Sequence, residues 1–471
     1  MNFKGIIYYL GLFILPISFF SFLNILYSSY FDYFLNTESY IFTLSTSIIL
    51  SIFCYLVSKN SLKEINFFEQ LILVVVVYFF SAILLAIPFY FSIYQITFIN
   101  AIFEAFSGIT GTGFTTFENI KYLDPTLIIW RSSSQWIGGL YFIIFLILFF
   151  SNSKFDFKLC SLVYSDDKSL NPEKSIKKIS LKVSIIYIFL TIFTFILFEI
   201  SGLRLFNSLN LSMTTVSSGG FIPANSLNSI IKDNLQKITL IISLTIPILS
   251  IYFFYNVINS RNFFKKHYED FSIILFGLIL SLVIFLTNNF AFLDVIINVV
   301  SSISNSGISP TKISGNLSLV FIFLTLIGGS ILSNTSGLKF LRLYILLKSS
   351  FSEIFRIVKP NYVVNKNILL SDNKINNEII KLSFYIFICF FISLFILSSL
   401  LLFDNITFEN AFKISILTLT NTTNSGIFGL ESLFFSNLLT FSKVSIIIFM
   451  IIGKIELLSL LLLLKKILTK N

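Results

Sequence analysis

Four short polar segments combine residue types that could bind a cation inside a membrane. Each follows a half-length apolar stretch and ends at a Gly that precedes a large apolar residue. The segments are Thr110–Gly113, Ser217–Gly220, Ser304–Gly307 and Thr423–Gly426. Their backbone carbonyl and hydroxyl oxygens carry no fixed charge and can replace the water shell of a monovalent ion. A divalent cation would more often attract carboxylates, and these segments contain none.

All the residues of these segments are candidate ligands. They are Thr110, Gly111, Thr112, Gly113, Ser217, Ser218, Gly219, Gly220, Ser304, Asn305, Ser306, Gly307, Thr423, Asn424, Ser425 and Gly426. Glycine lets the backbone turn its carbonyls toward a shared axis with φ values that other residues resist. A single such segment is more often an ordinary extracellular turn. Four of them with the same polarity favour a pore.

Long apolar runs would position these segments. Of the 471 residues, 55% are hydrophobic and 12% are charged, whereas a soluble domain has about 25% charged residues. Runs of about 20 apolar residues can cross the hydrocarbon core of a bilayer. We predict ten spanning helices, near residues 5–29, 39–58, 68–93, 126–150, 179–201, 234–258, 270–288, 317–347, 379–403 and 438–468.

The distribution of basic residues orients these helices. With a cytoplasmic N-terminus, the loops expected inside hold most of the 33 Lys and Arg residues. The opposite side includes Lys121, Lys232 and Lys312. The positive-inside rule therefore places both termini in the cytoplasm. The net charge of +10 suits anionic membrane lipid and requires no nucleic acid.

Several chemistries lack the residues that they need. Cys54, Cys160 and Cys389 show no metal-binding or redox spacing, and His267 is the single histidine. We expect His267, in a basic loop, to be solvated. An intramembrane enzyme would need facing nucleophile, base and metal ligands, which the sequence does not offer. We expect no cofactor and no enzymatic activity.

The polar segments divide the chain into four similar units. Each unit is a helix, a half-helix with a loop, and a second helix, which predicts an internal repeat. Non-helical backbone at membrane depth must be buried or line a watery cavity, so four such loops entering from outside would converge on one axis. The C-terminal, partially negative ends of the half-helices would then favour a cation. We expect two leading helices (residues 1–66) and repeats at 67–177, 178–268, 269–377 and 378–471.

This arrangement and its motifs resemble the Trk/Ktr/HKT superfamily of potassium and sodium transporters, and the leading helices look like those of its Trk branch. The matching stretches are SGITGTGFTT, TTVSSGGF, RSSSQWIGGLYFIIF and FMIIGKIELLSLLLLL. The resemblance implies an all-α polytopic membrane protein with four pseudo-symmetric helix–pore loop–helix repeats around one pore. In the fourth loop the spacing TNTTNSGIFG departs from the usual pattern.

The resemblance also implies a gate and a charge in the pore. The run LIGGSILSNTSGLK interrupts the eighth predicted helix and resembles the family's intramembrane gating loop. The gate residues implied are Gly328, Gly329, Ser330, Ser333, Asn334, Thr335, Ser336 and Gly337. Lys454 occupies the place of an arginine that projects into the pore, where it would limit leak as a cationic barrier. We expect Lys339 and Arg342 at a membrane interface or subunit contact, and Glu104 in a structural hydrogen bond.

Potassium uptake across the bacterial cytoplasmic membrane is the function that these features favour, with K⁺ at the four loops. Sodium or mixed Na⁺/K⁺ conduction on the same scaffold is an alternative. An ion-coupled secondary transporter is another, although it would predict inverted repeats and acidic residues at the midplane. The resemblance implies a homodimer and a cytoplasmic nucleotide-binding regulatory subunit. The basic loops Ser151–Ser180 and Lys348–Glu378 are the expected docking surface, unless they attract anionic lipid instead.

Overall fold

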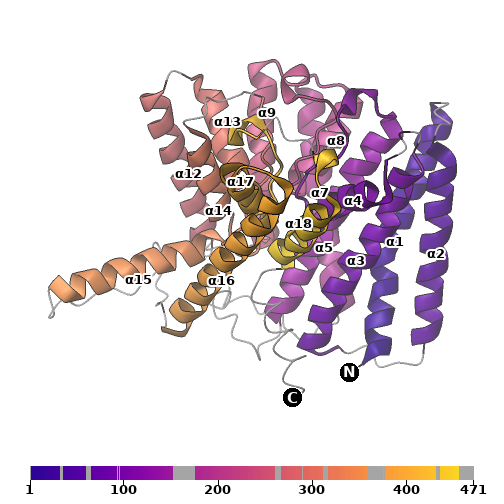
Figure 1. Ribbon diagram of the computed structural model, residues 1–471, viewed down its shortest axis with the longest axis horizontal. Coiled ribbons are helices and arrows are strands. Elements are labelled where there is room, and N and C mark those ends of the chain that lie inside the picture. The colour runs from indigo at the N-terminus through magenta and orange to yellow at the C-terminus, as the bar shows by residue number, and fades with distance from the viewer. Residues whose placement is uncertain are drawn as a thin grey trace.

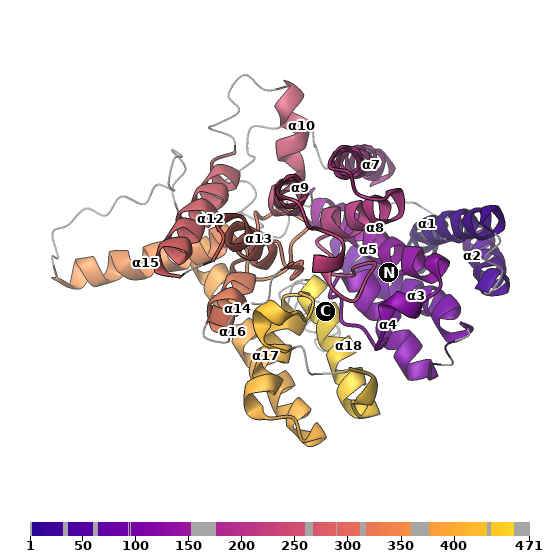
Figure 2. The ribbon, with the colours of Figure 1, turned by 90° about the horizontal axis from the view of Figure 1, so that it is seen from above.

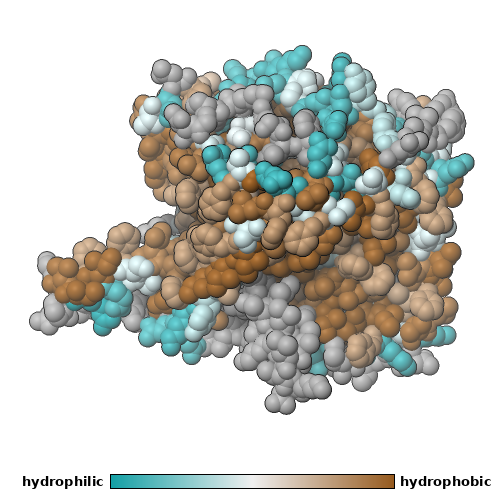
Figure 3. Space-filling model, in the orientation of Figure 1, coloured by the Kyte–Doolittle hydropathy of each residue, from teal (hydrophilic) through white to brown (hydrophobic). Residues whose placement is uncertain are grey.

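In the computed structural model, all the regular secondary structure of the described part of the chain is helical (Figure 1). The described residues are 2–31, 36–59, 65–92, 94, 96–151, 176–259, 267–288, 290–310, 317–358, 375, 377–430 and 435–455. Among these residues, seven helices are long and apolar enough to cross a membrane, and a bent pair makes an eighth. On the face shown in Figure 3, apolar side chains cover the flank of the bundle and polar side chains gather at its upper end. The fold is that of a multi-pass membrane protein.

Two helices precede four units that are built from helices in a similar order. The pair is α1 (Phe3–Tyr30) and α2 (Thr37–Ser58). The first unit is α3 (Phe67–Tyr90), α4 (Phe98–Thr110) and α5 (Pro125–Ser151), and the second is α7 (Ile176–Ile200), α8 (Leu205–Val216), α9 (Asn234–Thr245) and α10 (Ile251–Asn259). The third is α12 (Tyr268–Thr287), α13 (Phe292–Ile303), α14 (Ser318–Ile327) and α15 (Phe340–Val358), and the fourth is α16 (Asn377–Leu401), α17 (Phe408–Leu419) and α18 (Thr440–Ile455). Seen from above, the units surround one centre in chain order (Figure 2).

Two predicted spans are not continuous helices. The sixth bends by 105° between Asn234–Ile248 and Ile251–Val257, because Pro247 lacks a backbone N–H and the Ser250 N–H bonds to Asp270 Oδ1 at 2.8 Å instead of to its own helix. The eighth ends at Ile327 and resumes at Phe340 as α15, which leaves the bundle sideways (Figure 1). The last predicted span reaches residue 468, and its portion beyond residue 455 lies outside the described residues.

Helix α5 forms the packed centre against which the first two half-helices rest. Every residue from 126 to 149 is buried, and the stretch includes Ser132, Ser133 and Ser134, which let neighbouring backbones come close. Gly138 gives the closest approach, since a Cβ built on it would lie 1.8 Å from the carbonyl oxygen of Ile109 in α4. A glycine at this position is therefore what allows α4 to end against α5.

Replacing Gly138 by alanine should destabilise the protein by about 3 kcal/mol or more, because the added carbon meets backbone that cannot move aside. Gly277→Ala in α12 is the matched control, since its Cβ would lie 3.6 Å from Ile303 Cδ1 in ordinary contact. The measurement is thermal unfolding of both purified variants in detergent. Equal melting temperatures for the two variants would contradict the packing described here.

Candidate cation-binding site

The four half-helices end in the same turn. The residue at the turn has a left-handed backbone in each loop, with φ of 79° at Gly111, 58° at Ser218, 60° at Asn305 and 48° at Asn421. Each of these residues donates its N–H to the carbonyl three residues earlier, at 2.9–3.2 Å. Such φ values are uncommon outside glycine, and Asn tolerates them better than most residues. Because the turn geometry is shared, the four loops can be aligned residue by residue.

This geometry corrects the register of the fourth loop. Two residues beyond the turn lie Gly113, Gly220 and Gly307, and the fourth loop has Thr423 at that position. The turn bonds agree, because the N–H of Thr422 reaches the carbonyl five residues back as that of Gly219 does, at 2.9 and 2.8 Å. The fourth loop therefore runs over Thr420–Thr423.

The prediction Thr423–Gly426 was wrong by three residues because it aligned the loops on a Gly followed by an apolar residue. Helix α17 already ends at Leu419, and Gly426 begins a short 3₁₀ turn, Gly426–Phe428. Of the four predicted residues, Thr423 lies at the level of the other glycines. Asn424, Ser425 and Gly426 follow it and line the space outside.

Side chains at the turn link the loops to one another. Ser218 Oγ donates to the carbonyl oxygen of Ser304. Asn305 Nδ2 donates to Thr422 Oγ1 at 3.2 Å, and Asn421 Nδ2 donates to Thr112 Oγ1 at 3.0 Å. The second loop thus holds the third, the third holds the fourth, and the fourth holds the first.

The remaining link of this ring is at Gly111, which has no side chain to reach the second loop. A Cβ built there would lie 3.5 Å from Lys454 Nζ and 3.9 Å from the carbonyl oxygen of Ser217. Lys454 is 2% exposed, and its ammonium group lies 4.4 Å from the ring centroid of Phe142. The predicted pore lysine is therefore next to the loops, at the one turn without a linking side chain.

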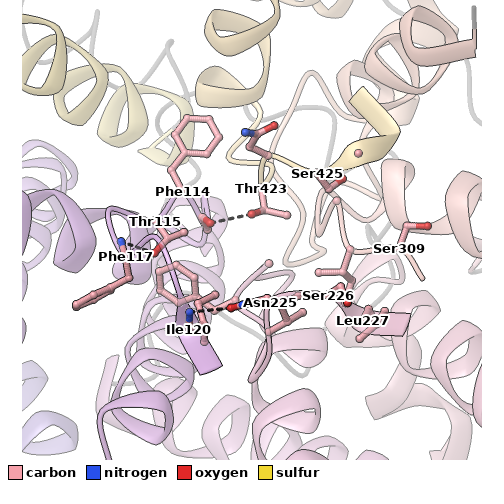
Figure 4. A pocket seen from close by; sticks show the side chains of 18 of the residues that line it. Phe114, Thr115, Phe117, Ile120, Asn225, Ser226, Leu227, Ser309, Thr423 and Ser425 are labelled. Atoms are coloured by element: carbon pink, nitrogen blue, oxygen red, sulfur yellow. Dashed lines mark hydrogen bonds between the residues drawn. The ribbon is translucent and has the colours of Figure 1, made fainter. Parts of the chain in front are cut away.

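The ends of all four loops line one cavity of about 420 Å³ (Figure 4). Gly113, Gly220, Gly307 and Thr423 line it. Phe114, Thr115, Asn225 and Ser425 also line it. Uncharged polar and apolar residues make up most of the lining of the cavity, which also includes Glu118 and Arg131. The cavity brings together one predicted residue or more from every loop.

A buried ion pair anchors the first loop. The Glu104 carboxylate in α4 accepts hydrogen bonds from Arg131 Nε at 2.8 Å and from the N–H of Thr116 at 2.8 Å. Arg131 is 1% exposed, and its guanidinium lies 4.1 Å from the ring centroid of Phe221 in the second loop. The prediction of a structural hydrogen bond for Glu104 is confirmed. The pair holds both loops to α5.

The predicted gate residues form the non-helical link between α14 and α15. This link lies against the break in the sixth span, since the N–H groups of Ser330 and Asn334 donate to the carbonyls of Ile248 and Pro247 at 2.9 and 3.2 Å. Asn334 Nδ2 also donates at 2.9 Å to the carbonyl oxygen of Val216, the last residue of α8. The link therefore touches the end of a half-helix directly.

Two adjacent carboxylates at the start of α12 hold both irregular segments. Glu269 Oε1 accepts the N–H of Ile331 in the link at 3.0 Å, and Asp270 accepts the N–H and Oγ of Ser250 in the break. His267 is buried with Nδ1 3.1 Å from Asp270 Oδ2. The expectation of a solvated histidine was wrong, because His267 is buried and pairs with the Asp270 carboxylate.

Lys339 and Arg342 are also buried, 1% and 3% exposed, and the expectation of a membrane-interface position was wrong. Lys339 Nζ donates to the Ser333 carbonyl and hydroxyl at 3.2 and 3.1 Å, and to Thr335. It lies 5.6 Å from the same Phe142 ring that Lys454 faces. Sequence reasoning misplaced this second ammonium group because its partners are carbonyl and hydroxyl groups of the link itself.

The fold and site define an integral membrane protein in which four helix–loop–helix units surround one axis. Residues 311–471 match the TrkH family, described as a cation transport protein. An uncharacterized cation transporter of Methanocaldococcus jannaschii is 27% identical over 400 residues, 83% of this chain and 82% of the relative. The Trk system potassium uptake protein TrkG of Escherichia coli is 26% identical over 423 residues, 85% of each chain.

The crystal structure of the potassium transporter TrkH from Vibrio parahaemolyticus has the same fold, with a TM-score of 0.82 over 98% of this chain and 99% of that one, at 21% identity. Together with the sequence matches, this makes the chain similar to Trk-type transporters in sequence and in fold.

Removing the Glu104 carboxylate should destabilise the protein by about 3–5 kcal/mol, because it leaves the Arg131 guanidinium buried without its counter-charge. Glu353→Ala is a matched control, since Glu353 pairs with Arg356 at 3.1 Å while both side chains are more than half exposed. Thermal unfolding of Glu104→Ala and Glu353→Ala should show a large loss for the first and little change for the second. Equal stability of Glu104→Ala and the parent would refute the anchoring role.

Proposed function

We propose that this protein takes up potassium through a channel-like pore whose selectivity filter is formed by the four loops. The supporting observation is that four loops of identical turn geometry meet at one cavity and present uncharged oxygens to it. Oxygen ligands of this kind can replace the hydration shell of K⁺. The names of the relatives agree, because a Trk potassium uptake protein matches over most of its length.

The filter residues are 110–113, 217–220 and 304–307, as the sequence indicates, with 420–423 in the fourth repeat. The repeats at residues 67–177, 178–268, 269–377 and 378–471 stay a proposal from the sequence, and their boundaries fall within the first residues of α7, α12 and α16. The link Gly328–Gly337 acts as the gate, for which its direct contact with α8 is the support. Straightening the link or the adjacent break would shift the half-helix that carries the second loop.

The ammonium groups of Lys454 and Lys339 form a cationic barrier on the inner side of the filter. Both are buried around Phe142, and a charge at this depth is expensive and usually functional. They repel a second cation and so limit leak. The membrane potential supplies the driving force, about 2.3 kcal/mol per charge for each 100 mV.

Sodium or mixed Na⁺/K⁺ conduction remains the second candidate. Each of the four loops expected from the sequence ends in a glycine, which favours potassium by the family resemblance. In the observed register, Thr423 stands at the glycine position of the fourth loop. A proton- or sodium-coupled mechanism with inverted repeats has less support, since each half-helix follows the first helix of its unit and ends in the same left-handed turn.

We infer a position in the bacterial cytoplasmic membrane with both termini inside, and the basic loops support this inference. It works as a homodimer with a cytoplasmic nucleotide-binding regulatory subunit. In support, α15 leaves the bundle and exposes Leu347, Phe351 and Ile354, an apolar face suited to a second copy. The docking loops Ser151–Ser180 and Lys348–Glu378 lie largely outside the described residues.

Growth complementation tests the proposed function. The full chain, expressed with its cognate regulatory subunit in a bacterium that lacks potassium uptake, should restore growth at low K⁺. Gly113→Ser and Gly220→Ser should abolish rescue, because a Cβ at these positions would lie 2.8 and 2.2 Å from Thr423 Cβ. Gly277→Ala serves as the control that still rescues. Absence of rescue by the parent, with membrane expression verified, would count against potassium uptake.

Lys454→Ala should raise the basal cation flux by roughly tenfold, which corresponds to a loss of about 1.4 kcal/mol from the free-energy barrier to ion passage.

 Lys454→Arg keeps the positive charge and should stay near the parent flux. Lys381→Ala, at an exposed lysine near the start of α16, controls for loss of a charge elsewhere. The measurement is flux into liposomes that contain the purified protein. If Lys454→Ala leaves the flux unchanged, the barrier role is wrong.

A further inference from the structure

The Thr423 side chain fills the space that the other three loops leave open. A Cβ built on Gly220 would lie 2.2 Å from Thr423 Cβ and 2.4 Å from its Cγ2, and one on Gly113 would lie 2.8 Å from Thr423 Cβ. A Cβ on Gly307 would lie 2.9 Å from Thr423 Cγ2. The three glycines therefore face a single point, and one threonine side chain occupies it.

A hydrogen bond keeps this side chain in place. Thr423 Oγ1 donates to the carbonyl oxygen of Gly113 at 2.7 Å (Figure 4). The same carbonyl is a candidate ion ligand of the first loop. Because a carbonyl that accepts this bond has less electron density to offer an ion, the hydroxyl and a passing cation compete for it. Thr423 is 5% exposed, and it borders the cavity above the loops.

We propose that Thr423 is a movable plug in the filter, which sets both the transport rate and the size of cation that passes. This inference rests on the proposed cation path. For an ion to cross the level of the three glycines, the Thr423 side chain must turn about its Cα–Cβ bond and release the Gly113 carbonyl. Its hydroxyl and that carbonyl then serve as two of the ligands that replace water.

A side chain that intrudes on a narrow path hinders large ions more than small ones. Since Rb⁺ is larger than K⁺ and K⁺ is larger than Na⁺, the plug should penalise the three cations in that order. The β-branch of threonine restricts its rotation about Cα–Cβ, which makes the movement a defined step. Three substitutions separate the two parts of the side chain. Glycine removes both, serine removes the methyl group, and valine keeps the volume without the hydroxyl.

The experiment measures Rb⁺, K⁺ and Na⁺ flux into liposomes that contain the full-length protein or a variant, at equal protein content. Thr423→Gly should raise Rb⁺ and K⁺ flux by about tenfold and Na⁺ flux by less, with Thr423→Ser between it and the parent. Thr423→Val should lower the flux of all three ions, because the plug remains and its ligand is lost. Thr46→Val in α2, where the hydroxyl bonds only within its own helix, should match the parent.

The outcomes distinguish this inference from the proposed function. A parent protein that conducts none of the three cations would overturn the cation path itself. A parent that conducts them, with Thr423→Gly unchanged in flux and in the Rb⁺, K⁺ and Na⁺ order, would overturn the plug alone. Because valine has nearly the shape of threonine, Thr423→Val should fold. Parental flux through Thr423→Val would likewise overturn the part given to the hydroxyl.

Discussion

Backbone that is not helical must find hydrogen-bond partners inside the protein when it lies at membrane depth, and this constraint shapes the whole molecule. The described chain leaves the helical pattern at this depth in six places: the four loops, the break at Ser250 and the link Gly328–Lys339. Each is held by named partners from other elements. Asp270 and Glu269 hold the break and the link, and side chains at three of the turns join the four loops to one another.

The same constraint explains why small residues gather around the axis. The half-helices can end close together because α5 offers serines and glycines, with Gly138 against the end of α4. Arg131 on the same helix then neutralises Glu104 and packs on Phe221, so that one element fixes two loops. The loops are positioned by a rigid centre and leave their carbonyl oxygens for a ligand.

Much of this architecture can be predicted from the sequence, because each feature has a local signal. Apolar length gives the spans, and a polar run after a half-length apolar stretch gives the loops. The run around Gly328 marks the broken eighth span. The fourth register was missed because glycine was taken as the marker, whereas the turn can be made by Asn421 with Thr423 two residues on.

The burial of Lys339 and Glu269 could not be predicted because their partners are distant in the chain or are backbone atoms. Lys339 bonds to the link that precedes it, and Glu269 reaches Ile331 across two helices. From the sequence alone, His267 resembles part of a basic surface loop. Pro247 is a local signal for the bend in the sixth span. The bend also depends on the Asp270 carboxylate, which accepts the hydrogen bonds of Ser250 and is distant in the sequence.

Locating a heavy monovalent cation in the full-length protein tests the central claim most directly. Crystals soaked with Tl⁺ would show its position by anomalous scattering. The account predicts a peak on the axis between residues 110–113, 217–220, 304–307 and 420–423, with oxygen ligands from all four loops. A peak coordinated by residues 423–426 in place of 420–423, or one away from the loops altogether, would contradict it.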